Sequence, residues 1–147
     1  ILNYSYTNKK INHESVQKLS NLSENYNVSE LADHFLAKNI KNVTKILNEN
    51  NYSDEDCILI LRTILSKSKR LLNIIENNEK VKNVDTAILK AKPPIFWKDK
   101  EIVKKQVNTW DLEELKKKVY QINEIEILIK TNTKNSLNII SDFIINY

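Results

Sequence analysis

The chain has 147 residues, a net charge of +4, no glycine and no methionine, which suits one domain, or one domain with a piece of another. The missing glycines exclude Walker-type phosphate loops, dinucleotide-binding fingerprints and nucleophile elbows, because each needs positive φ or close approach of a ligand to the backbone. Cys57 is the single cysteine, so an internal disulfide is excluded and a reducing compartment is favoured. No apolar run approaches the roughly 20 residues of a membrane span, and we expect a cytoplasmic piece of a longer protein.

The apolar spacing is helical from the first third of the chain onward. A short helix is predicted after Asn12, which is a good N-cap residue. A second helix is predicted from about Ser29 and a third from about Ile40, each with an inward face at the 3–4 spacing of a buried stripe. The residues predicted to face inward are Leu31, Phe35, Leu36, Val43, Ile46 and Leu47.

The longest predicted helix begins at the segment SDED. Ser53 is its predicted N-cap, and three acidic residues follow in the first turn, where they complement the helix dipole. Arg62 and Arg70 are predicted on the polar face, two turns apart. The opposite, apolar face is predicted to hold Cys57, Leu61, Ile64, Leu65, Ser68, Leu71, Leu72 and Ile75.

Four further helices are predicted in the last third. One near 84–89 is expected to stop before Pro93 and Pro94, since proline disfavours α conformation in the residue before it. The others cover about 98–107, a segment capped by Asp111 with Glu114 in the reciprocal arrangement, and about 134–145. Their predicted inward residues include Leu112, Leu115, Val119, Ile122, Ile125, Ile129, Leu137, Ile140 and Ile144. No alternating strand pattern occurs, so the predicted fold is all-α, a compact helical bundle without a sheet.

The residue types that most often carry chemistry do not form a recognisable site. His13 and His34 are far apart and lack metal-ligand spacing with Cys57. The acids at 54–56 lack the spacing and the glycine of an EF-hand loop, and two isolated histidines do not indicate a Ser–His–Asp arrangement. We therefore predict no catalytic, cofactor-binding or metal-binding residue in this chain, and no enzymatic activity.

The positive charge is concentrated between Lys90 and Lys118. This segment holds nine lysines at 90, 92, 98, 100, 104, 105, 116, 117 and 118. It holds five acids at 99, 101, 111, 113 and 114, so its excess of four (nine minus five) equals that of the whole chain. A solvated helix face is the more common explanation of such a segment. A surface that attracts nucleic-acid phosphates is the alternative.

Both tryptophans and both arginines permit two interpretations. Trp97 and Trp110 could be core residues, the commoner fate of tryptophan in a bundle, or anchors for a partner protein. Arg62 and Arg70 could form exposed ion pairs of little energetic value. Alternatively, they could form an edge that grips carboxylate or phosphate, for which the guanidinium fork is suited.

The order of five segments resembles a known family. The segments are INHESVQKL, SELADHFLAKNIKNVTKIL, ILILRTILSKSKRLL, AKPPIFWKDK and QVNTWDLEELKKKVYQINEIEILIK. Two prolines followed by aromatic residues, a basic helix and a tryptophan before the next helix are its most specific part. In this order the features resemble the C-terminal part of the delta subunit of bacterial DNA polymerase III, a component of the sliding-clamp loader. The resemblance covers essentially the whole chain.

The resemblance implies a domain organisation and a function. Residues 27–147 are expected to form the helical collar domain, and residues 1–26 the tail of the small helical middle domain. Such a subunit hydrolyses no ATP. Its collar assembles it with the ATPase subunits of the gamma or tau type and with delta-prime, so that the clamp is loaded on primed DNA during replication. The clamp itself is expected to be gripped by an N-terminal domain, which we expect to lie outside these 147 residues. The alternative is a stand-alone nucleic-acid-binding or adaptor domain of the helical class.

The resemblance also implies where the contacts lie. The proline pair is expected to set the angle between two collar helices, with Phe96 and Trp97 packing that corner. The residues expected at the interfaces between subunits are Arg62, Arg70, Phe96, Trp97 and Trp110. Those expected near DNA are Lys98, Lys100, Lys130 and Lys134. No cofactor and no membrane contact are expected.

Overall fold

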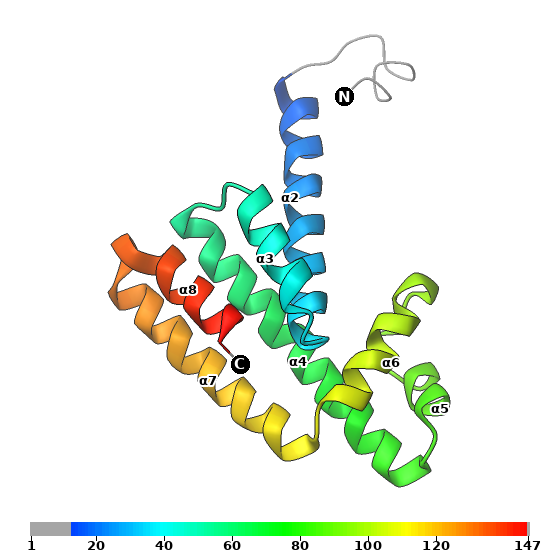
Figure 1. Cartoon of the computed structure of the whole chain (residues 1–147). Coiled ribbons are helices and arrows are strands. Elements are labelled where there is room, and N and C mark those ends of the chain that lie inside the picture. Colours follow the sequence, from blue (N-terminus) through cyan, green and yellow to red (C-terminus); the bar gives the residue numbers. More distant parts are fainter. Residues whose placement is uncertain (1–12, 147) are drawn as a thin grey trace.

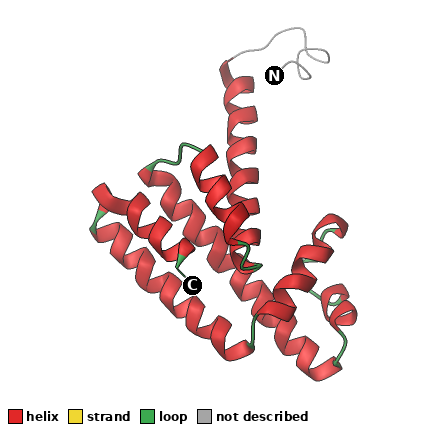
Figure 2. Cartoon of the chain, viewed as in Figure 1, coloured by secondary structure: helices red, strands yellow, loops and turns green. Residues whose placement is uncertain are grey.

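The computed structural model describes residues 13–146, and every regular element in that range is a helix (Figures 1 and 2). The predicted all-α class is therefore confirmed. The α-helices are α2 (His13–Leu36), α3 (Ile40–Glu49), α4 (Asp54–Val81), α5 (Val84–Leu89), α6 (Lys100–Thr109), α7 (Leu112–Thr131) and α8 (Ser136–Ile145). Two short 3₁₀ turns, η1 (Trp97–Asp99) and η2 (Thr133–Asn135), precede α6 and α8. None of the described helices is long and apolar enough to cross a membrane.

The central element is α4, which packs against α2, α5, α6, α7 and α8. It begins at the predicted N-cap: the hydroxyl of Ser53 accepts a hydrogen bond from the Asp56 amide, and the Asp56 carboxylate accepts one from the Ser53 amide at 2.7 Å. This capping box satisfies two backbone donors that a helix start leaves without partners. At its other end Lys82 adopts a left-handed conformation. The helices α7 and α8 lie on one flank of α4, and α5 and α6 lie on the other (Figure 1).

The N-terminal segment differs from the prediction. Two helices were predicted, but one continuous helix, α2, runs through both segments. The intervening residues contain neither proline nor glycine, so nothing in the backbone stops the helix. Side-chain burial begins at Val28, whereas Tyr26 and the other side chains from 14 to 26 are exposed or only partly buried. The assignment of residues 1–26 to a separate domain stays a prediction, and residues 1–12 lie outside the described range.

The hydrophobic core follows the predicted stripes with a few differences. All eight predicted positions on α4 are buried or partly buried, and Ile60 and Ile74 are buried in addition. The buried surface of α4 is wider than one stripe because five helices pack around it. The prediction was wrong for Leu137, which is exposed on α8 beside the buried Ile140. Cys57 is fully buried, and burial raises the pKa of its thiol to about 11, so it is protonated and unreactive near neutral pH.

The start of α7 combines a predicted cap with a contact that the sequence did not indicate. The carboxylate of Asp111 accepts a hydrogen bond from the Glu114 amide at 2.6 Å, as predicted. The Glu114 side chain forms an ion pair with Lys38 at 2.6 Å. This contact joins the turn after α2 to the first turn of α7.

Candidate interaction surfaces

The two prolines lie in the segment that joins α5 to η1, residues 90–96, which we call the proline corner. Arg70, on α4, donates two hydrogen bonds from Nη2 to this segment, at 2.6 Å to the carbonyl of Pro93 and at 2.7 Å to that of Pro94. The peptide bond between Lys92 and Pro93 is cis. Both acceptors are uncharged carbonyls. The Arg70 guanidinium therefore holds the proline corner against α4 through hydrogen bonds, and these contacts do not neutralise its charge.

Two aromatic side chains protrude at the end of the proline corner. Phe96 is 59% exposed and Trp97 is 67% exposed, and their ring centroids lie 5.9 Å apart in a tilted arrangement. Leu89, at the end of α5, is also exposed. The expectation that Phe96 and Trp97 pack the corner is therefore wrong. Isolated exposed apolar residues are common, but a cluster of large ones marks candidate interaction sites.

Trp110 has the opposite environment. It is 4% exposed, and its indole Nε1 donates a 2.6 Å hydrogen bond to the carbonyl of Leu36. The ammonium of Lys38 lies 4.1 Å from the centroid of the Trp110 ring. Trp110 therefore fastens the junction between α6 and α7 to the end of α2. Of the two tryptophans, only Trp97 is accessible to a partner of this chain.

Arg62 and Arg70 line one groove on the outer face of α4, which we call the α4 groove. It has a volume of about 550 Å³. Its other basic side chains are Lys67, Lys69 and Lys92, and no carboxylate contributes to its walls. Arg62 forms only a loose ion pair with Glu126, at 3.8 Å. The two arginines thus share an electropositive surface, although Arg70 is already engaged by the proline corner.

The four lysines expected near DNA do not form one surface. The ammonium of Lys98 lies 5.4 Å from the centroid of the Trp97 ring, and the partly exposed Lys100 begins α6. Lys130 and Lys134 line a separate pocket of about 500 Å³ between the start of α4 and the turn from α7 to α8. Two carboxylates, of residues 54 and 55, line the same pocket. The pocket is therefore mixed in charge.

Lys130 is further engaged by Glu126, one turn earlier on α7. Their 2.7 Å contact, with a smaller contribution from Arg62, lowers the pKa of the Glu126 carboxyl. Glu126 therefore stays ionised and shares its charge between the two basic side chains. The positive charge available to a ligand at this point is smaller than the sequence suggests.

Several lysines of the basic segment from Lys90 to Lys118 are paired with carboxylates or buried in the fold. Lys104 forms ion pairs with Asp85 at 2.6 Å and with Glu101 at 3.8 Å. Lys116 forms one with Glu113 at 3.0 Å, whereas Lys118 is buried. The segment is thus not a continuous basic surface. The α4 groove is built largely from α4, with Lys92 as the basic residue that this segment contributes.

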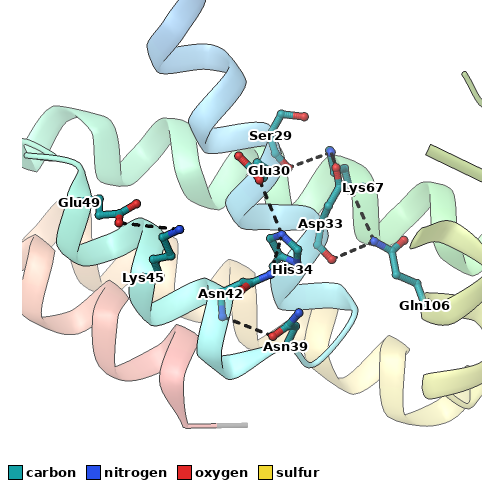
Figure 3. A network of polar contacts seen from close by, with 10 residues as sticks. All are labelled: Ser29, Glu30, Asp33, His34, Asn39, Asn42, Lys45, Glu49, Lys67 and Gln106. Carbon is teal, nitrogen blue, oxygen red and sulfur yellow. Dashed lines mark hydrogen bonds and ion pairs between the residues drawn. The ribbon is translucent and has the colours of Figure 1, made fainter. Parts of the chain in front are cut away.

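A polar network that the sequence did not indicate lies where α2, α4 and α6 meet (Figure 3). The carboxylate of Asp33 forms a short ion pair with Lys67, whose ammonium also donates to the carbonyl of Ser29 at 3.0 Å. Gln106, which is 3% exposed, donates to the carbonyl of Asp33 at 3.0 Å. Because these residues come from three helices, no local spacing relates them. The closed, mutually satisfied contacts indicate a structural role.

The described residues contain no group of three or more histidine, cysteine or acidic side chains placed to hold a metal ion. The Nε2 atom of His34 lies 3.4 Å from the side-chain amide of Asn42 and 3.8 Å from the carboxylate of Glu30, and Cys57 lies in the core. The candidate interaction surfaces are the proline corner with its aromatic pair and the α4 groove. Comparison of the chain with protein-family models, with curated proteins and with solved structures gives no match.

Proposed function

We propose that this chain is the collar part of a bacterial clamp-loader delta subunit, a non-catalytic assembly module that acts in the cytoplasm. In this function it holds the ATPase and delta-prime subunits beside it, so that the sliding clamp is loaded onto primed DNA. The order of the sequence motifs suggests the family. The exposed pair of Phe96 and Trp97 on the proline corner is the observation that carries the assembly role.

The aromatic pair lies on a segment that is held in place as well as exposed. Large aromatic side chains supply much of the binding energy at protein interfaces. A surface that is already ordered before binding loses less conformational entropy when the complex forms. Arg70 ties the proline corner to α4 through two short hydrogen bonds, and Phe96 and Trp97 follow two and three residues after Pro94. The pair is thus presented on a supported segment, as an interface anchor requires.

The test is assembly with purified ATPase and delta-prime subunits of the same loader, measured by native mass spectrometry and by titration. The double variant Phe96→Ala and Trp97→Ala is expected to weaken the complex at least tenfold, which corresponds to about 1.4 kcal/mol. Tyr120→Ala is the matched control, because Tyr120 is also highly exposed, but on α7. If neither this chain nor the full-length protein assembles with these subunits, the loader assignment is wrong.

A second candidate is binding of nucleic acid, favoured by the exposed ring of Trp97 next to Lys98 and by the α4 groove nearby. Aromatic rings on which bases stack, combined with a cationic groove, are typical of single-strand binding. This function predicts that the chain alone binds a fluorescein-labelled oligothymidine, with an affinity that falls steeply as salt rises. Substitution of Lys69 and Lys92 by glutamate should abolish that binding. The same change at the exposed Lys105 and Lys117 should reduce it less.

A further inference from the structure

The α4 groove follows one face of a single helix. Most of its lining residues belong to α4 and recur at helical spacing, at positions 62, 63, 66, 67, 69, 70 and 73. From 62 to 73 the helix rises about 16 Å, at 1.5 Å per residue. Lys92 and Pro93, from the proline corner, complete the lining. The groove is therefore long enough to contact several repeating units of an extended ligand.

Most of the positive charge in the α4 groove lacks a close carboxylate. Lys69 and Lys92 are exposed and form no ion pair with any residue that the structure describes. Arg70 donates to two uncharged carbonyls, and Arg62 approaches a carboxylate of α7 only to 3.8 Å. Lys67 alone among the five is closely paired, with a carboxylate of α2. The like charges repel one another, and a polyanion in the groove would relieve that repulsion.

The uncharged residues of the groove favour phosphate over a polypeptide. Ser66 and Asn73 are exposed, and side chains of these types commonly donate hydrogen bonds to phosphate oxygens. The lining residues include no leucine, isoleucine, valine or aromatic residue. Protein interfaces depend on such apolar anchors and are poor in lysine at their centre. The composition of the groove is therefore that of a phosphate-binding surface.

The α4 groove is also separate from the aromatic pair. Phe96, Trp97 and Lys98 are not among its lining residues. Binding of phosphates in the groove therefore needs no base stacked on Trp97, in contrast to the single-strand mode considered above. The aromatic pair stays free for a neighbouring subunit.

We propose that the α4 groove binds the phosphate backbone of nucleic acid independently of Trp97, so that one chain holds nucleic acid and a neighbouring subunit on two distinct surfaces. The simultaneous use of both surfaces rests on the proposed function, whereas the phosphate site itself does not. One strand of a duplex places a phosphate about every 3.4 Å along the axis, so the groove matches about five of them. Contacts of this kind carry no base-sequence information.

The experiment titrates the chain alone into a fluorescein-labelled oligothymidine and, separately, into a labelled duplex of mixed sequence. Replacing both Lys69 and Lys92 with glutamine, which we call the groove variant, is expected to weaken binding of each probe at least tenfold. The matched control replaces Lys105 and Lys117, which are exposed and do not line the groove. It removes the same charge and should weaken binding less than twofold. Trp97→Ala should also change the affinity less than twofold.

The salt dependence gives a second readout that a structural effect would not move. A plot of log affinity against log salt concentration should become less steep in the groove variant, by about 0.7 for each lysine with oligothymidine and about 0.9 with the duplex. The control variant should keep the slope of the unmodified chain. Equal slopes in all three proteins would show that Lys69 and Lys92 do not contact phosphates.

A comparison with subunit assembly tests whether the two surfaces are distinct. The groove variant should lose nucleic acid and bind the purified ATPase and delta-prime subunits within twofold of the unmodified chain. The Phe96 and Trp97 double variant should show the opposite losses. If the groove variant loses subunit binding to the same extent, the groove belongs to the subunit interface and the proposal is wrong.

Other results would also overturn it. Binding of oligothymidine that Trp97→Ala abolishes would show that stacking carries the affinity. If polyglutamate with the same number of charges displaces the probes equally well, an acidic polypeptide is the ligand instead. If the chain assembles with the subunits but binds neither probe, the phosphate site fails and the proposed function stands. If the probes bind as expected while neither this chain nor the full-length protein assembles, the loader assignment fails and the phosphate site stands.

Discussion

Replacing Trp110 with alanine is expected to lower the free energy of unfolding by about 3–5 kcal/mol, the usual cost of removing a large buried aromatic side chain. The ring is almost fully buried between the end of α2 and the junction of α6 with α7. Its removal leaves a cavity and deprives the Leu36 carbonyl of its indole donor. It also removes the ring over which the ammonium of Lys38 lies. A loss of this size is a large part of the stability of an ordinary domain.

The measurement is urea denaturation followed by far-ultraviolet circular dichroism, which does not depend on tryptophan fluorescence. Trp110→Phe should recover most of the packing but not the hydrogen bond, and its loss should be intermediate. Trp97→Ala is the control and should change the stability by less than about 0.5 kcal/mol, since its ring is exposed. Equal effects of the two alanine substitutions would contradict the different environments of the two tryptophans.

Replacing Lys67 with methionine is expected to cost about 2 kcal/mol. Removal of one partner from a buried ion pair typically costs 3–5 kcal/mol, and the partial exposure of this pair reduces the figure. The side chains of Lys67 and Asp33 are 26% and 20% exposed. After the substitution Asp33 would keep only its contact with Gln106, and the carbonyl of Ser29 would lose the ammonium that donates to it. The linkage between α2 and α4 would weaken at that point (Figure 3).

Lys69→Met provides the control for this prediction. Lys69 lies two residues further along α4, is exposed, and forms no ion pair with any residue that the structure describes. Its replacement should change the unfolding free energy by less than about 0.5 kcal/mol. In a double-mutant cycle, Asp33→Ala combined with Lys67→Met should cost clearly less than the sum of the two single changes. Additive losses would show that the two side chains contribute independently.

The charge distribution shows where sequence reasoning is weakest. The positions of the lysines in the sequence predicted a basic surface at residues 90–118. This prediction could consider only residues that are close in sequence. In the fold, Lys104 is neutralised by Asp85 from another helix, and Lys118 is buried against α8. The α4 groove combines Arg62 and Lys69 from α4 with Lys92 from the proline corner. Electrostatic surfaces depend on such distant neighbours.

For a related reason, the sequence did not decide which of the two tryptophans is buried. Trp97 and Trp110 have similar sequence surroundings, and each precedes or begins a helix. Trp110 lies against the end of α2, where the Leu36 carbonyl accepts its indole hydrogen bond, whereas none of the described residues covers Trp97 in the same way. Arg70 was predicted on a polar face and lies there, but its partners are carbonyls 23 and 24 residues further along the chain. Local spacing does not reveal contacts of this kind.

The sequence by itself determined the features that local physics controls. The 3–4 apolar spacing specified the helices and most of the core, Ser53 and Asp111 specified two helix starts, and the absence of glycine excluded the common nucleotide-binding loops. Tertiary structure decided the different environments of the two tryptophans, the role of Arg70, and the position of Lys118 beside the Phe143 ring. The physical reason is range: capping and periodicity act within one or two turns, whereas burial and ion pairing depend on which helices meet.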